Sequence, residues 1–316
     1  MPAPSSLPPE PQELSLQSPE RRQFLGNMGR YGLGAGLLAT GLLTPAARAE
    51  TAAPVTDKPA WQNWSGSQKV APANIFYPDS EAALQKAIRE TNGQIRAFGG
   101  GHSFNAVVPT NAQGSLISLE ALNGLVSYDA AALTATLWAG TRIASTGPLL
   151  QDINQGLLNE ADINMQSLGG AISTATHGTG RKMQCYSATV KGLRIAMADG
   201  SVVDCSAEKE RELFEAARVA VGSIGIITQA TLQNRAAYRL REQVNVMQID
   251  EAMRTLESER DKHRHMEFFA FPYGEKAIVK RMDISEEAPT KVEEPFINEN
   301  AILEFAADSA RKHPWT

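Results

Sequence analysis

The chain of 316 residues has only two cysteines, no large excess of charge of one sign and no long uninterrupted hydrophobic run. Two cysteines exclude a scaffold of several disulfides, and neither Cys185 nor Cys205 lies in a Cys-x-x-Cys pair or at metal-ligand spacing from a histidine. One structural disulfide between them remains open, and two separate buried thiols are the favoured alternative. The formal net charge of −5, with no basic stripe, argues against a nucleic-acid partner.

What is present is the composition of an ordinary globular protein, with 42% hydrophobic and 21% charged residues. The length suggests about two domains. No internal repeat is found.

The first 49 residues have the features of an export signal. Twin arginines at 21–22 precede a glycine-thinned apolar stretch at 31–43, and an Ala-x-Ala sequence ends at Ala49. This resembles a bacterial Tat signal peptide cleaved after Ala49, although Glu20 and Gly26 depart from its usual residues. The alternative, a permanent membrane anchor, is disfavoured because the stretch is shorter than the roughly 20 residues that cross a bilayer. The expected location is therefore periplasmic or secreted, with the Tat machinery as a partner and a cofactor loaded before export.

The rest of the chain divides into three parts that differ in their residue patterns. Residues 50–70 are mixed and linker-like, residues 71–235 alternate short strands and helices, and a change of pattern at residue 236 marks the start of a second α+β domain, incomplete at 316. Mixed elements with short connections predict an α+β fold. Alternation and helical spacing predict strands at 75–77, 95–98, 116–119, 126–129, 133–138, 190–197, 202–205, 224–232, 242–249 and 267–271, and helices at 80–91, 143–155, 208–219 and 250–265.

The glycines that follow the strand at 95–98 are the first candidate site. Gly99, Gly100 and Gly101 are followed by His102 and Ser103. Consecutive glycines allow backbone N–H groups to converge on an anion, and a pyrophosphate suits such a loop. The spacing fits neither a Rossmann fingerprint nor a P-loop. A flexible turn is the alternative for a lone glycine triplet.

A second candidate loop lies at 167–180, where glycines alternate with serines and threonines and no periodicity is visible. Backbone donors and small hydroxyls together suit a phosphate or polyol chain lying close to the main chain. Two such loops within one predicted domain favour a nucleotide-type cofactor over a coincidence.

The segments IRAFGGGHSFNAVVPTNAQGSLISLEALNGLV, TATLWAGTRI, GGAISTATHGTG and VVDCSAEKERELFEAARVAVGSIGIIT, in this order, resemble the FAD domain of sugar-1,4-lactone and alditol oxidases. These belong to the vanillyl-alcohol-oxidase, or PCMH-type, flavoproteins. The resemblance covers roughly 61–232. It implies a PCMH-type FAD-binding domain of two α/β subdomains, followed by the start of a substrate domain.

The resemblance also implies roles for individual residues. Phe98 to Ser103 become the pyrophosphate loop, and His102 becomes the residue bonded to the 8α carbon of FAD. Asp162 becomes a weaker candidate near the flavin. The full set of cofactor-binding residues implied is Phe98, Gly99, Gly100, Gly101, His102, Ser103, Phe104, Asp162, Ser167, Gly170, Ala171, Ile172, Ser173, Thr174, His177, Gly178, Ile226 and Ile227.

Two departures from the family pattern concern these loops. Gly100 replaces a serine common in this family, and the stretch 156–159 is about two residues shorter than usual. Independently of the resemblance, a neutral imidazole at His102 is a competent nucleophile toward an oxidised flavin. A structural histidine in a glycine loop is the alternative.

The implied activity is oxidation of a CH–OH group of a sugar lactone or alditol, with hydride passing to flavin N5 and O₂ reoxidising the flavin to give H₂O₂. An electron carrier in place of O₂ and a truncated FAD-binding protein without full activity remain alternatives. The catalytic base stays unknown, because the family's later substrate-domain motif does not occur. His263 and His265 lie among charges with no third ligand, so a solvated face is expected and no metal is assigned.

Overall fold

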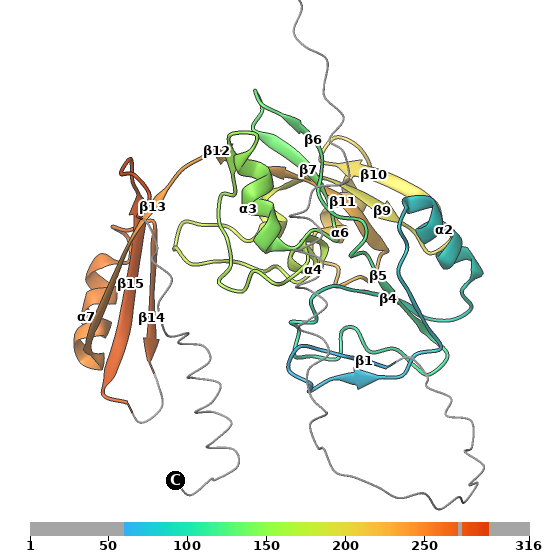
Figure 1. Ribbon diagram of the computed structural model, residues 1–316, viewed down its shortest axis with the longest axis horizontal. Coiled ribbons are helices and arrows are strands. Elements are labelled where there is room, and N and C mark those ends of the chain that lie inside the picture. The colour runs from blue at the N-terminus through green and yellow to red at the C-terminus, as the bar shows by residue number, and fades with distance from the viewer. Residues whose placement is uncertain (1–59, 271–273, 291–316) are drawn as a thin grey trace, which may run out of the picture. The chain divides into compact units, whose positions relative to one another are not determined.

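The computed structural model describes residues 60–270 and 274–290, all within the compact unit Thr56–Thr316. Its architecture is mixed helix and sheet (Figure 1), which confirms the predicted α+β class. The signal-like segment at 1–49 lies outside the described residues. Within them, no helix is long and apolar enough to cross a membrane.

A small parallel sheet begins the domain. Its strands are β3 (Asn74–Phe76), β5 (Ser115–Ser118) and β4 (Ile95–Phe98), with β5 in the middle. Every residue of β5 is buried, as expected for the central strand of a parallel sheet. Because parallel strands need a crossover, α2 (Glu81–Glu90) follows β3, and the Ser80 hydroxyl caps it by accepting from the N–H of Ala83 at 3.2 Å.

A five-stranded antiparallel sheet carries the main core. Its order is β10 (Val202–Ser206), β9 (Val190–Ala196), β11 (Ile226–Gln233), β7 (Thr134–Trp138) and β6 (Leu125–Asp129). The Asp199-Gly200 turn joins β9 to β10, as its sequence predicts, with Gly200 at φ +78°. The buried faces of these strands pack into one cluster with α2 and the helices described next.

Four further helices and two short strands complete this region. They are α3 (Ile143–Gln151), β8 (Gln155–Gly156), α4 (Leu168–Ser173), α5 (Tyr186–Thr189), α6 (Arg211–Ala217) and β12 (Arg235–Ala236), with β12 paired to β8. The helix α4 corrects the expectation of an irregular loop from 167 to 180. Leu168, Ala171 and Ile172 are fully buried, so core packing overrides the low helix propensity of its glycines.

A hairpin at the start of the described residues pairs β1 (Trp61–Gln62) with β2 (Lys69–Val70). It falls in the segment assigned to a linker. Its turn contacts the glycine loop, because the N–H of Trp64 donates to the carbonyl oxygen of Gly101 at 2.8 Å. The hairpin is therefore part of the scaffold around that loop.

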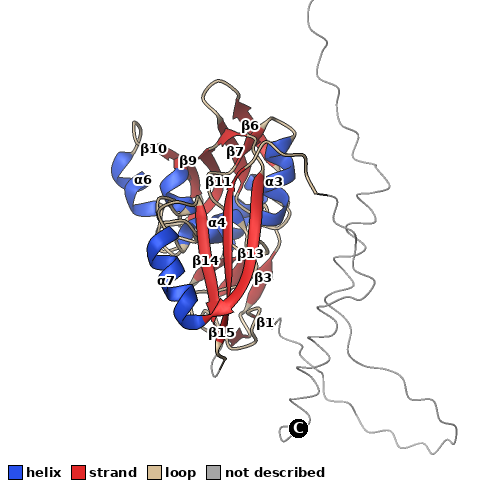
Figure 2. Cartoon of the chain, turned by 90° about the vertical axis from the view of Figure 1, so that its left-hand side faces the viewer, coloured by secondary structure: helices blue, strands red, loops and turns tan. Residues whose placement is uncertain are grey.

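The region predicted as a second domain contains a three-stranded sheet of order β13 (Leu240–Gln248), β15 (Lys276–Ile284) and β14 (His265–Ala270), with α7 (Ile249–Glu259) between β13 and β14 in sequence. Figure 2 shows α7 beside this sheet, and Ala252 packs with Ala277 and Val279. The predicted helix ends six residues early, since β14 begins at His265. The strand β15 was not predicted.

The two histidines of this region do not share a solvated face. His265 is buried, and its Nδ1 lies 3.0 Å from the carbonyl oxygen of Thr179. His263 is half-buried, with Nδ1 2.6 Å from Oδ2 of Asp283. The expectation failed because each histidine packs against a residue far away in the sequence, Thr179 for His265 and Asp283 for His263, and charge patterning does not reveal such contacts.

The two cysteines are free thiols, Cys205 buried and Cys185 half-buried. The prediction of two separate thiols is therefore confirmed, while the prediction that both are buried is confirmed for Cys205 alone.

Candidate cofactor-binding site

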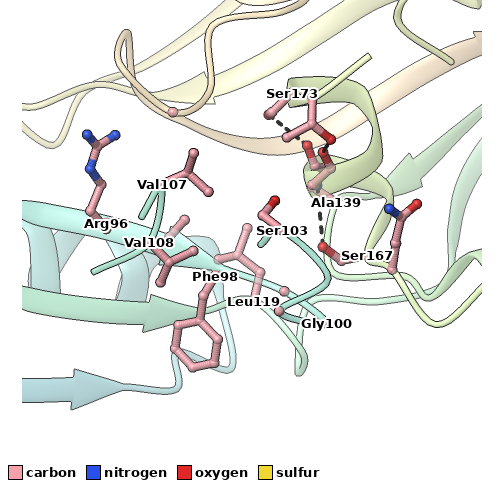
Figure 3. Close-up of a pocket in the computed structure, with 18 of the residues that line it drawn as sticks. Arg96, Phe98, Gly100, Ser103, Val107, Val108, Leu119, Ala139, Ser167 and Ser173 are labelled. Carbon is pink, nitrogen blue, oxygen red and sulfur yellow. Dashed lines mark hydrogen bonds between the residues drawn. The ribbon is translucent and has the colours of Figure 1, made fainter. Parts of the chain in front are cut away.

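One cavity gathers the glycine loop, the segment before α3, the start of α4 and the turn before β11 (Figure 3). It lies between the small parallel sheet and the five-stranded sheet, which supply β4 and β11 respectively. The lining residues that enter the argument below are Trp61, Arg96, Gly99 to Ser103, Arg142, Gln166, Ser167, Val221, Ile226 and Ile227. An elongated ligand that touches both sheets fits this arrangement.

The glycines of the loop are required by close approach of the neighbouring chain. A Cβ on Gly99 would overlap the Ser167 side chain, and one on Gly100 would lie 2.5 Å from the carbonyl oxygen of Met165. Gly101 has φ +68°, a conformation that side chains disfavour. The loop can therefore lie against the segment before α4 only because it lacks side chains.

The main chain of this loop offers free donors. Among the described residues, the N–H groups of Gly100, Gly101, His102 and Ser103 donate to no protein acceptor. Consecutive unpaired N–H groups form a concavity suited to an anion. The loop thus has the donor set that a pyrophosphate needs.

Two arginines and a glutamine add polar groups to the cavity. The Nε atom of Arg96 and the Oε1 atom of Gln166 are buried without a hydrogen-bond partner among the described residues. Arg142 donates from Nη1 to the carbonyl oxygen of Met165 at 2.9 Å and lies beside Gly100. Buried polar atoms normally find partners, so these groups fit a cavity built to hold a polar, anionic ligand such as a dinucleotide.

His102 projects from the loop into this environment. Its ring stacks on the indole of Trp64, with centroids 5.4 Å apart and an interplanar angle of 27°. Burial, and secondarily the Arg142 guanidinium, lower the pKa of His102 below its ordinary value. The imidazole is therefore neutral near pH 7 and available as a nucleophile.

The sequence predicted that the hydrogen-bond donors of the segment 167–174 face a phosphate, but the structure shows other partners for several of them. Ser167 caps α4, its Oγ accepting from the N–H of Gly170 at 3.3 Å. The hydroxyls of Ser173 and Thr174 donate to the carbonyl oxygens of Gly169 and Gly170, four residues back (Figure 3). Because α4 is helical, most of these donors are used within the chain.

The structure brings together many of the residues proposed from the sequence. Those that line the cavity are Phe98, Gly99, Gly100, Gly101, His102, Ser103, Ser167, Gly170, Ser173, Thr174, Ile226 and Ile227. Those that do not line it are Phe104, Asp162, Ala171, Ile172, His177 and Gly178. Ala171 and Ile172 face the core from α4, and Phe104 is 62% exposed.

Several lining residues were missed. Arg142 follows Thr141 at a helix start, and Arg96 lies within a strand. At such positions the sequence alone does not show whether a side chain points into the cavity or into solvent. Val221 lines the cavity at φ +51°, an unusual conformation for a β-branched residue. For the hairpin beside the glycine loop the sequence offered one signal, the two tryptophans Trp61 and Trp64 in an otherwise polar segment.

Comparison with protein families matches two parts of the chain. Residues 72–206 match the family described as FAD binding domain, and residues 230–312 match the family D-arabinono-1,4-lactone oxidase. The second match extends beyond the described residues. Together they agree with the resemblance drawn from the loops.

Two curated proteins that are similar to this chain are named for activities on sugar lactones. L-gulono-1,4-lactone dehydrogenase of Mycobacterium tuberculosis is 35% identical over 266 residues, covering 81% of this chain and 60% of that protein. L-gulonolactone oxidase of Bos taurus is 28% identical over 233 residues, covering 73% of this chain and 52% of that protein. The chain thus spans about 60% or less of the length of these relatives.

Among solved structures, cholesterol oxidase from Brevibacterium sterolicum superimposes with a TM-score of 0.67 at 20% identity, covering 79% of this chain and 54% of that chain. At this identity the likeness concerns the fold alone.

Proposed function

We propose, from the family matches at 72–206 and 230–312, that this chain is a member of the FAD-linked sugar-lactone oxidases and dehydrogenases and oxidises a CH–OH group of an aldono-1,4-lactone. An alditol is the second substrate class. The names of the two relatives above refer to lactones. Both relatives are longer than this chain, so the activity is proposed for the whole protein.

The observation that carries the proposal is the row of N–H groups from Gly100 to Ser103 beside Arg142, which find no acceptor within 60–270 and 274–290. These residues would hold the pyrophosphate of FAD, and Arg96 and Gln166 have buried polar atoms still to be paired in the same cavity. Backbone donors and a fixed cation compensate the phosphate charges.

FAD, when bound, supplies a two-electron acceptor for the substrate's carbinol hydrogen. His102 is proposed to hold the flavin covalently. Its lowered pKa keeps the ring nitrogen unprotonated, as bond formation requires. No catalytic base is assigned.

The test begins with the absorption spectrum of the purified protein before and after acid precipitation. Flavin that stays with the precipitate in wild type and is released in His102→Ala supports the covalent link. Complete release from wild type contradicts it. Bleaching of the flavin by gulono-, galactono- or arabinono-1,4-lactone under anaerobic conditions then tests the activity.

Two electron acceptors are compatible with the relatives, whose names include both oxidases and dehydrogenases. We propose O₂ as the acceptor. Formation of H₂O₂ equal to the lactone consumed supports an oxidase, whereas turnover only with an added dye or carrier protein supports a dehydrogenase.

Stable flavin that no lactone or polyol bleaches would contradict the proposed activity and would leave only FAD binding.

Export through the Tat pathway to the periplasm is proposed from the twin arginines at 21–22 and Ala49. Replacing both arginines by lysine should retain the precursor in the cytoplasm of the host cell. Sequencing of the exported protein should give Glu50 as its first residue. Export of the lysine variant at the wild-type level would contradict the proposal.

A further inference from the structure

Three large aromatic side chains are exposed around the glycine loop. Trp64, Phe104 and Tyr77 expose 70%, 62% and 56% of their surface. Trp64 meets Phe104 edge to face, and Tyr77 meets Phe98 in the same way. An exposed indole contributes little to the core. The role of Trp64 must therefore come from the groups that its ring contacts.

The face of the Trp64 indole touches His102. The centroids of the two rings are 5.4 Å apart and their planes are 27° from parallel, a stacked geometry. Among the described residues, no hydrogen bond is made by the imidazole of His102. Its ring orientation is thus determined by packing, and the indole is the ring against which it packs.

The backbone on both sides of His102 is held by the same hairpin turn. The N–H of Trp64 donates to the carbonyl oxygen of Gly101 at 2.8 Å, and Nδ2 of Asn63 donates to the carbonyl oxygen of Ser103 at 2.9 Å. Asn63 is 2% exposed, and its Oδ1 accepts from the N–H of Gln68 at 3.0 Å. Residues 63 and 64 therefore position His102 through its main chain and its ring together.

We propose that Trp64 is a positioning residue that orients the His102 imidazole for covalent attachment of the flavin, an inference that rests on the proposed bond at His102. The indole face prevents rotation of the imidazole plane and presents one ring nitrogen to the cavity. Attachment then starts from an oriented nucleophile.

The step that Trp64 assists balances without an added reagent. One imidazole nitrogen bonds to the 8α methyl carbon, the imidazole N–H and one methyl C–H are broken, and the two hydrogens with the electron pair pass into the flavin ring. The ring is thereby reduced by two electrons. The electron acceptor used in turnover, O₂ or a carrier, reoxidises it.

The experiment measures the rate of attachment at saturating FAD. The full chain is prepared without flavin, mixed with excess FAD, and sampled into acid, and the flavin fluorescence that stays with the protein band is followed with time. Wild type, Trp64→Ala, Trp64→Phe and His102→Ala are compared. Tyr128→Ala removes another exposed aromatic side chain, on β6 and distant in sequence from the loop, and is the matched control.

We expect Trp64→Ala to attach flavin roughly 10- to 100-fold more slowly than wild type, the cost of a misplaced reacting group. Trp64→Phe, which keeps an aromatic face, should recover most of the rate, and Tyr128→Ala should equal wild type. Dissociation constants for FAD measured in the His102→Ala background should be unchanged by Trp64→Ala, because the anion donors remain.

Attachment by Trp64→Ala at the wild-type rate would overturn the inference. A rate that Trp64→Phe does not raise above that of Trp64→Ala would overturn it as well. Failure of the proposed function gives a different result, since wild type itself would then form no acid-stable flavin. A poorly folded Trp64→Ala is recognised by circular dichroism. Trp64→Leu, which keeps an apolar side chain without an aromatic face, then takes its place in the comparison with Trp64→Phe, and equal rates of these two variants would overturn the inference.

Discussion

The side chain of Ser167 occupies the space in which a Cβ on Gly99 would lie. This contact joins the two loops that the sequence singles out, through residues 68 positions apart, and it makes the glycine at position 99 a steric requirement. The same serine caps α4 through the N–H of Gly170. A change at Gly99 therefore reaches the helix as well as the loop.

We expect Gly99→Ala to displace Ser167 and to weaken FAD binding. Loss of the cap costs about 1 kcal/mol, which corresponds to roughly fivefold in affinity if the loop must recover its shape on binding. Titration of flavin-free protein with FAD in the His102→Ala background measures it. Gly147→Ala is the control, because a Cβ there meets nothing within 4 Å in the interior of α3. It should leave the affinity for FAD unchanged. Equal affinity of both variants would contradict the steric argument.

Elements with strong local signals were predictable. Ser80 before an amphipathic run located α2, and Asp199-Gly200 located the turn between β9 and β10. In both places the local sequence preference and the tertiary packing agree. The glycine loop was also predictable, because three consecutive glycines directly after a strand are a strong local signal for a close-packed loop.

Elements that depend on distant contacts were not predictable. The helix α4 contains Gly169 and Gly170, and it forms because Ile172 and its neighbours are buried. The contribution of Trp64 depends on a hydrogen bond to Gly101, far along the chain. The inward direction of Arg142 likewise requires the fold to be known.

The pH dependence of the proposed flavin attachment would follow the protonation state of His102. In that reaction the neutral imidazole is the nucleophile, and burial together with the Arg142 charge lowers the pKa of His102 from 6.5 in the folded protein. Wild type should therefore attach flavin at a constant rate as pH falls through 6.5 and should slow only at lower pH. Arg142→Met removes the positive charge, so the pKa of His102 rises and the rate should begin to fall at a higher pH.

Rate–pH profiles of wild type and Arg142→Met, at saturating FAD, test this order. Superimposable profiles would show that the Arg142 charge has no effect on His102. Arg239→Met, which changes a charge outside the cavity, is the control and should follow wild type.

A charged network joins α2 to the five-stranded sheet. Arg194 donates from Nη2 to Glu81 at 2.9 Å and from Nη1 to Asp204 at 2.9 Å, and the Thr228 hydroxyl donates to Glu81 at 2.9 Å. Burial raises the pKa of Glu81, but the hydrogen bonds from Arg194 and Thr228 lower it further, to below its ordinary 4.5. A carboxylate with a lowered folded pKa stabilises the protein above its unfolded pKa, and this stability is lost as pH falls through the folded value.

We expect Glu81→Gln to lower the free energy of unfolding by about 1.5–3 kcal/mol at pH 7, the usual range for hydrogen bonds to a charged group. The deficit should shrink below pH 4.5, where wild type loses the same contribution. Urea unfolding at a series of pH values measures both. Glu90→Gln, whose partner Lys86 is 3.9 Å away on an exposed face, should change stability by less than about 1 kcal/mol at either pH.

Arg264 is the clearest direct contact between the second sheet and the segment before α4. Its Nη2 donates to the carbonyl oxygen of Leu158 at 2.6 Å, and its guanidinium lies over the ring of Tyr238, 5.1 Å from the centroid. Arg264→Met keeps the length of the side chain but removes the charge and the donors. We expect a loss of about 1–3 kcal/mol, because the carbonyl oxygen of Leu158 loses a charged partner.

The loss should appear as faster proteolysis in the 235–240 segment and as a lower unfolding temperature. Arg241→Met is the matched control, since Arg241 pairs with Glu287 at 3.2 Å on an exposed surface where ion pairs contribute little. Equal proteolysis of the two variants would mean that the Leu158 contact does not hold the second sheet.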